Sequence, residues 1–313
     1  MHDNFKDNSV IIHRQSRLKR LILALAFFFS WLCQSSLAQE QNAITISHPP
    51  RIAIVLDDLG SQLAMGLRAI SIPRNGPITY AVLPYTPYGK RLAKIAHQQN
   101  DEVILHLPME PLGNHTHEGM LTHEMQRQEV IASLRDSLDE IPHINGFNNH
   151  MGSLLTQQSD HMRWIMEEIS LNTSLFFLDS RTSSRSVAYK TAKAHDIPSL
   201  KRDVFLDSIQ SIEFVEKQFG KLLTVAMKQG YAIGIGHPYP ETLLVLEKYL
   251  PTLNGLGFEL VTLSDILNSP TTFPYHYAAK SGSSLSMKKI SEQENLIFSH
   301  QTDQPELAND ILP

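Results

Sequence analysis

Two adjacent aspartates end an apolar run near residue 55. In the segment RIAIVLDDLG, residues 51–60, Asp57 and Asp58 follow residues suited to a buried strand. A buried carboxylate is costly unless it is hydrogen-bonded, paired with a cation or bound to a metal. The pair therefore predicts a polar site at the end of a core strand.

Residues able to do chemistry also follow the other apolar runs of the chain. They are His106 and Glu110, then Asn148, Asn149 and His150, then Asp179, Ser180 and Arg181, and finally Asp207 and His237. Each group falls at the carboxyl end of an expected strand, where parallel α/β folds place their active sites. We expect these side chains to converge on one site.

The residue types in this set favour a metal centre. An imidazole at His106 and a carboxylate at Asp58 are ligands that borderline divalent cations accept. His150 would complete an Asp-His-His set suited to zinc, and Glu110, four residues after His106, is the alternative or additional ligand. Histidines of the segment NHTHEGMLTH, residues 114–123, are more typical of a solvated loop.

Strand alternation bears on which aspartate points inward. Side chains alternate between the two faces of a strand, so Asp58 shares a face with Ile52, Ile54 and Leu56, and Asp57 lies on the opposite face. We take Asp58 to continue the inward face. Gly60 would allow a turn that brings both carboxylates to one centre.

Several other chemistries fit the sequence less well. No Gly-x-Ser-x-Gly elbow and no dinucleotide-binding glycine pattern is present. The single cysteine, Cys33, lies in the signal peptide expected at residues 1–38, so a mature chain would have no thiol nucleophile. A glycosidase with two carboxylates would leave the histidines unexplained.

The hydrophobic pattern predicts one α/β domain over residues 51–268. Apolar runs alternate with amphipathic segments, and strands linked by helices pair in parallel. We therefore expect a distorted barrel of seven or eight (β/α) units. The expected strands are 51–57, 77–84, 102–108, 144–150, 174–180, 202–207, 231–238 and 258–263, and the expected helices are 88–99, 125–141, 159–171, 186–195, 211–230 and 240–257.

The two ends of the chain differ from this domain. Residues 1–38 have the basic start, apolar run of about a dozen residues and small-residue exit of a secretory signal peptide, since a membrane anchor would need about 20. Cleavage after Ala38 would give an exported, periplasmic protein without a permanent membrane span, starting with a short leader, residues 39–50. Residues 269–313 are polar and predict a disordered tail.

Charge argues against nucleic acid as a partner. The whole chain has 27 basic and 32 acidic residues, and residues 1–38 hold five and two of them, so the mature chain has a formal charge of −8. A basic footprint for nucleic acid is absent.

Taken together, these motifs resemble the divergent branch of the polysaccharide deacetylase superfamily, which shares the NodB-homology domain. The segments that carry the resemblance are IVLDDLG, HLPME, GFNNHMGS, FFLDSRTS, RDVFLD and GIGHPYP. The resemblance implies that Asp57 is the catalytic base, Asp58 and His106 bind the metal, Glu110 stands in place of a second histidine, and His237 is the general acid. The family's arginine-proline motif, which holds the base, is replaced by NNHMGS, and Arg181 or Arg202 is left for that role.

The resemblance implies a metal-dependent hydrolase acting on an N-acetylated envelope polysaccharide such as peptidoglycan. Asn148, Asn149, Arg181 and Asp179 would serve the substrate or its oxyanion. The alternative is a non-catalytic glycan-binding or scaffolding protein on a degenerate deacetylase barrel. The missing arginine motif and Glu110 motivate that alternative.

Overall fold

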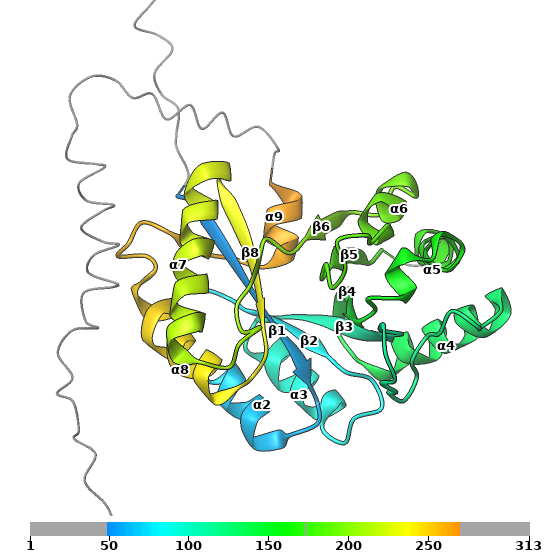
Figure 1. Cartoon of the computed structure of the whole chain (residues 1–313). Helices are drawn as coiled ribbons and strands as arrows, with labels where there is room; N and C mark the ends of the chain where they lie inside the picture. Colours follow the sequence, from blue (N-terminus) through cyan, green and yellow to red (C-terminus); the bar gives the residue numbers. More distant parts are fainter. Residues whose placement is uncertain (1–48, 173, 270–313) are drawn as a thin grey trace, which may run out of the picture. The chain divides into compact units, whose positions relative to one another are not determined.

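Parallel strands organise the part of the chain that the computed structural model describes, residues 49–172 and 174–269 (Figure 1). The expected signal peptide, the short leader at 39–50 and the expected tail lie outside these residues, apart from residues 49, 50 and 269. The strands are β1 (Arg51–Leu59), β2 (Thr79–Val82), β3 (Glu102–Met109), β4 (Ile144–Met151), β5 (Phe176–Asp179), β6 (Ser199–Lys201), β7 (Val204–Phe205), β8 (Tyr231–Gly236) and β9 (Glu259–Leu260).

The strands form one sheet in the order β6-β5-β4-β3-β2-β1-β8-β7, and β9 also pairs with β1. Every pairing is parallel. The connecting helices are α2 (Leu63–Ile70), α3 (Gly89–Gln98), α4 (Arg127–Glu140), α5 (Ser159–Asn172), α6 (Ala188–Ala194), α7 (Ile212–Gln229), α8 (Pro240–Tyr249) and α9 (Leu263–Asn268), with short 3₁₀ turns η1 (Leu155–Gln157) and η2 (Leu250–Thr252). The expected parallel α/β fold is confirmed as a half-barrel sheet with surrounding helices.

The sheet curves without a ladder between its two edge strands, β6 and β7. Only Arg202 and Asp203 separate them in the chain. The Arg202 amide donates to the carbonyl of Asp179 at β5, whereas the Asp203 amide donates to that of Ile233 in β8. At these two consecutive residues the chain therefore passes from one edge of the sheet to the other. The single strand expected at 202–207 is therefore wrong in detail, because the chain changes edges there.

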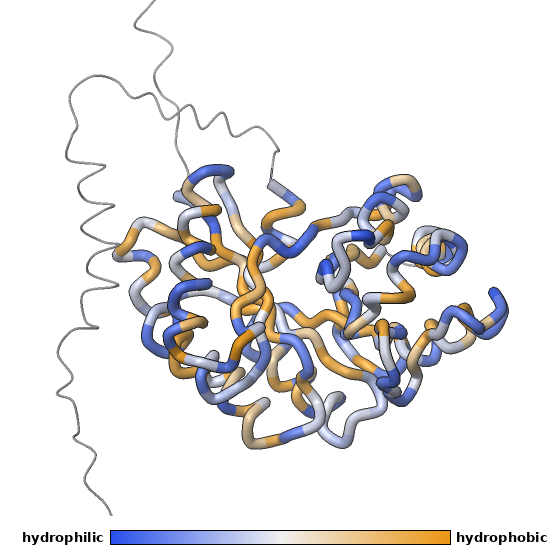
Figure 2. The backbone as a smooth tube through the Cα atoms, viewed as in Figure 1, coloured by the Kyte–Doolittle hydropathy of each residue, from blue (hydrophilic) through white to orange (hydrophobic). Residues whose placement is uncertain are grey.

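Side chains of the strands divide into two cores. Residues such as Ala53, Val55 and Ile104 belong to a cluster on the concave face, together with Ile233 and Ile235 of β8. Residues of opposite parity, including Ile52, Ile54 and Leu56, pack against the surrounding helices. Figure 2 shows the hydrophobic strands inside and hydrophilic stretches along the outer helices.

Helix α9 closes the amino end of the concave face. The strand expected at 258–263 is wrong beyond Leu260, because Thr262 begins a helix there: its hydroxyl accepts from the amide of Asp265, whose side chain accepts in return. Leu263 and Ile266 of this helix join the inner cluster. The opposite, carboxyl end of the strands is left to the polar residues.

Helix boundaries follow local signals in most places. In α7 the Ser211 hydroxyl accepts from the amide of Phe214, and Gly230 ends the helix with a φ of 88°. Helix α2 is not among the helices expected from the sequence, and Gly66 lies in its middle. A Cβ at Gly66 would fall 2.4 Å from Leu92 of α3, so this glycine lets the two helices approach closely. Among the described residues, no helix is long and apolar enough to cross a bilayer.

Candidate active site

A bulge at the end of β1 positions both aspartates. Leu56 pairs with Tyr80 and Leu59 with Val82, so β1 takes three steps where β2 takes two. Asp58, inside the bulge, has a φ of 60°, a left-handed conformation that aspartate tolerates better than most residues. The prediction that Asp58 continues the inward face is wrong: Asp57 does so by alternation with Ala53 and Val55, and the bulge turns Asp58 toward the same centre.

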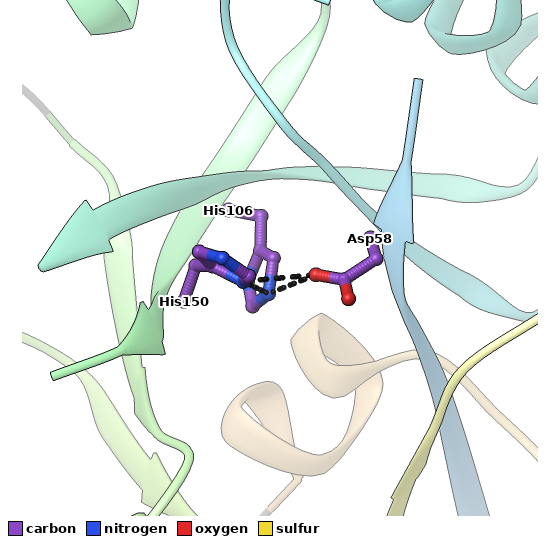
Figure 3. Close-up of side chains that lie close together, drawn as sticks. All are labelled: Asp58, His106 and His150. Carbon is purple, nitrogen blue, oxygen red and sulfur yellow. Dashed lines mark hydrogen bonds and ion pairs between the residues drawn. The ribbon is translucent and has the colours of Figure 1, made fainter. Parts of the chain in front are cut away.

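Asp58, His106 and His150 bring three ligand atoms together from β1, β3 and β4 (Figure 3). Asp58 Oδ1 lies 3.1 Å from His106 Nε2 and 2.9 Å from His150 Nδ1, and the two nitrogens are 3.1 Å apart. Metal bonds of about 2.0–2.1 Å would give ligand separations of roughly 2.9 Å in an octahedral site and 3.3 Å in a tetrahedral one. The triangle has the dimensions of a face of either polyhedron.

The hydrogen bonding of this triangle also fits a cation. Asp58 Oδ1 is buried and accepts no hydrogen bond of regular geometry, although two imidazole nitrogens lie 2.9 and 3.1 Å from it. Burial alone would favour the neutral acid, but His106 and His150 hold the pKa of Asp58 well below its usual range. An ionised oxygen without a hydrogen, facing two ring nitrogens, is the donor set expected of a divalent metal site.

Asp57 is buried next to this triangle. Its Oδ2 lies 3.6 Å from His106 Nε2, and its Oδ1 accepts a hydrogen bond of 2.9 Å from the side-chain amide of Asn148. Burial raises the pKa of Asp57, which the positive charges of His106 and His237 partly oppose. A carboxylate with a raised pKa is well suited to take up a proton.

His237 faces the same centre from the end of β8. Its Nε2 lies 3.7 Å from Asp58 Oδ2, and its Nδ1 is 3.0 Å from Oδ1 of the buried Asp207. Burial opposes the charged imidazole, but the bond to Asp207 and the nearby carboxylates raise the pKa of His237 to about 9. At neutral pH this ring carries a proton that it can donate.

Glu110 is not among the residues that meet at the triangle. Its Oε2 accepts from both the backbone amide and Nδ1 of His123, each at 2.7 Å. Its backbone also pairs with Leu121, so Glu110 anchors the loop between β3 and α4. The structure thus brings together His150, and not Glu110, with Asp58 and His106.

Asn149 and Asp179 point away from the concave face because of their parity. Asn149 Oδ1 accepts from the amide of Ser180, and its Nδ2 donates to the carbonyl of Met151. Asp179 accepts from the amide of Arg181 and from the Ser186 hydroxyl. Both side chains hold the loop after β5 and have no donor directed at the triangle.

The two arginines considered for holding the base have different surroundings. Arg181 is exposed and has a φ of 51°. Arg202 is partly buried, donates to the carbonyls of Ser180 and Arg181, and lies over the ring of Phe205. Burial lowers the pKa of Arg202, an effect that the charge of Asp57 opposes. Arg202 is therefore near enough to the base for their charges to interact, while its guanidinium is hydrogen-bonded to backbone carbonyls.

Two side chains near the site have no predicted role in it. The sequence places Asp207 at a strand end but does not predict its contact with His237, although an aspartate after RDVFL and a histidine after GIG end neighbouring strands. His117, in the loop expected to be solvated, has its ring centroid 5.3 Å from that of His150. The cluster of histidines in residues 114–123 is the sequence feature that points to His117 as a residue near the site.

The half-barrel and this set of side chains define a protein of the deacetylase-barrel class, and comparison with known proteins gives the family. Residues 54–267 match the divergent polysaccharide deacetylase family, and the chain belongs to it. It is 34% identical over 221 residues to the uncharacterized protein YibQ of Escherichia coli, covering 70% of this chain and 68% of YibQ. An uncharacterized protein of Haemophilus influenzae is 35% identical over 225 residues, covering 72% and 79%.

A solved structure shares the fold. The uncharacterized protein ATU2773 of Agrobacterium tumefaciens superposes with a TM-score of 0.66 at 24% identity, covering 71% of this chain and 91% of that one. This likeness supports the half-barrel.

Proposed function

We propose that this protein is a metal-dependent hydrolase that removes acetyl groups from an N-acetylated polysaccharide of the cell envelope. The observation that carries the proposal is the triangle of Asp58 Oδ1, His106 Nε2 and His150 Nδ1. Two groups able to transfer protons, Asp57 and His237, lie beside it. Family membership supports a glycan as the substrate. A divalent cation, which we propose to be zinc, would supply Lewis-acid activation of the acetyl carbonyl and of water.

Asp57 is the proposed general base. It is buried, it lies 3.6 Å from His106 Nε2, and its raised pKa favours uptake of the proton that a water molecule loses as it attacks the acetyl carbon. Because Asn148 holds Asp57 Oδ1, the other oxygen, Oδ2, is the one directed toward the triangle.

His237 is the proposed general acid. The hydrogen bond between its Nδ1 and Asp207 leaves Nε2 facing Asp58 and the reaction centre. Its proton would pass to the amine nitrogen as the carbon–nitrogen bond breaks, and the products would be acetate and a free amino sugar. Asp207 stabilises the charged imidazole, as a buried carboxylate does in other acid–base pairs.

We also propose that the protein acts in the periplasm after removal of residues 1–38. The layout of the first 38 residues supports export. Intact-mass measurement of protein purified from the envelope should find a chain beginning at Gln39. A full-length mass in that fraction would contradict cleavage.

Hydrolysis can be tested with metal-loaded protein and its Asp57→Asn variant. N-acetylglucosamine oligomers and peptidoglycan fragments are incubated with each protein, and acetate and free amine are measured together. We expect equal amounts of both products from the parent and a loss of about 10²–10⁴-fold in Asp57→Asn, which keeps the side-chain shape but cannot act as a base. Binding of the fragments without any product from the parent would favour the glycan-binding alternative.

A further inference from the structure

Asn148 lies between the proposed base and one of the proposed metal ligands. It is on β4, completely buried, and on the concave face with His150. Its amide contacts His106 on one side and Asp57 and Ser180 on the other. One side chain therefore joins the two centres of the site.

The contacts determine the orientation of the amide. A carboxylate oxygen only accepts hydrogen bonds when ionised, so the NH₂ group must face Asp57, with Nδ2 at 2.9 Å from Oδ1. The amide oxygen then faces His106, 2.7 Å from Nδ1. Since that oxygen can only accept, Nδ1 of His106 must carry a hydrogen, and in the neutral ring, the form that binds a metal, Nε2 presents its lone pair to the triangle.

Asn148 has no hydrogen left for a substrate. Its second N–H donates to Ser180 Oγ at 3.2 Å. The sequence-based expectation that Asn148 binds the oxyanion or a sugar hydroxyl does not agree with this geometry. Its contacts are all with side chains of the site.

We propose that Asn148 is a positioning residue that fixes the metal-binding tautomer of His106 and the orientation of Asp57 with the same amide group. The part concerning Asp57 rests on the proposed function. The part concerning His106 requires only that the triangle binds a cation. The neighbouring Asn149, which is equally buried but faces the other side of β4, provides a matched control.

The test measures zinc affinity by chelator competition and His106 ¹⁵N shifts in metal-free protein. In Asn148→Leu we expect a roughly 10- to 100-fold loss of affinity, the range for a group that orients a metal ligand, and loss of the Nδ1-protonated signal of His106. Asn148→Asp keeps an acceptor for His106, so its affinity should exceed that of Asn148→Leu. Asn149→Leu should bind zinc like the parent, with folding of every variant checked by circular dichroism.

Acetate release at saturating zinc tests the role of Asn148 toward Asp57. Under this condition both Asn148 variants should still release acetate more slowly than the parent, because neither donates the amide hydrogen bond to Asp57. The proposal would be overturned if Asn148→Leu bound zinc as tightly as the parent. It would also be overturned if Asn149→Leu lost as much zinc affinity as Asn148→Leu. If the parent releases no acetate, the proposed function fails, whereas the affinity comparison still decides the role of Asn148 toward His106.

Discussion

Asp58 reaches the site through its backbone conformation. A regular strand would send Asp57 and Asp58 to opposite faces, and the left-handed φ of 60° at Asp58 removes that conflict. Aspartate is among the few residues with a side chain that tolerate this conformation. The proposed metal binding and the local geometry thus both favour aspartate at position 58.

The ligand set predicts a contrast between two carboxylates. Asp58→Asn keeps the side-chain shape and tolerates the left-handed backbone, but it removes the charge from the triangle, so zinc affinity should fall by more than the roughly 10- to 100-fold of an orienting residue. Glu110→Gln should leave zinc affinity unchanged, because Glu110 contacts His123 instead. Isothermal titration of both variants checks this. Equal losses would return Glu110 to the ligand set.

The Glu110–His123 contact predicts a pH-dependent hydrogen bond in the loop before α4. Burial opposes ionisation of Glu110, but its bonds with the backbone and side chain of His123 together lower the pKa of Glu110, and the side-chain bond raises the pKa of His123 above 6.5. The stabilisation of the fold that comes from the raised pKa of His123 is therefore fully present below pH 6.5 and is lost as pH rises through the folded pKa of His123. The stabilisation that comes from the lowered pKa of Glu110 is present above pH 4.5 and is lost as pH falls through the folded pKa of Glu110.

NMR titration of His123 checks the sign of this shift. In Glu110→Gln the pKa of His123 should fall toward 6.5, while Glu118→Gln, which changes an exposed carboxylate of the same loop, should leave it raised. The same pKa in the parent and in Glu110→Gln would show that the contact does not form in solution.

At the residue level, the sequence predicted most of the side chains that lie together at the strand ends, but not the reason for their geometry. Asp57, Asp58, His106, His150 and His237 follow apolar runs, and strand ends converge in parallel folds. Spacing alone could not separate Glu110 from His150, because the choice depends on which way the chain turns after β3. Nor could it show that both ends of the Asn148 amide are occupied.

At the level of elements, Glu102 at the start of β3 holds α9 in place. Its buried carboxylate accepts from the Thr79 hydroxyl and from the amides of Leu263 and Ser264 at the first turn of α9. Ionised acceptors suit helix amino ends because unpaired N–H groups and the helix dipole meet there. This contact closes the inner core.

Glu102→Gln is therefore expected to destabilise the fold by about 1–3 kcal/mol, since a side-chain amide has one accepting oxygen where the carboxylate has two. Urea unfolding measures the change. The exposed Glu259→Gln, on β9 at the same end, should stay within about 0.5 kcal/mol of the parent. Equal stability of the two variants would contradict the role of Glu102.

Short elements were the ones that the sequence pattern missed. Residues 258–263, FELVTL, alternate like a strand, yet the Thr262–Asp265 capping pair begins α9 within them. β6 has only three residues, and its edge position depends on the crossing at Arg202 and Asp203. Such features depend on tertiary contacts, whereas long segments such as α7 carry enough periodicity and capping signals to be predicted.

In the molecule as a whole, the two ends of the half-barrel have different tasks. The amino end is closed by α9 and carries contacts that stabilise the fold, whereas the carboxyl end gathers Asp57, Asp58, His106, His150 and His237. This division is common in parallel α/β barrels. Variants at the amino end should therefore change stability without changing zinc affinity.

The most direct test of the central claim is the acetate released from N-acetylglucosamine oligomers as metal is removed and restored. We predict that the parent binds one zinc ion per chain, that chelation abolishes acetate release, and that one equivalent of zinc restores it. His106→Ala, which lacks a proposed ligand, should not be restored by the same equivalent. Undiminished acetate release by metal-free protein, or no release by protein with one bound zinc, would contradict the assignment of this site as a metal-dependent deacetylase centre.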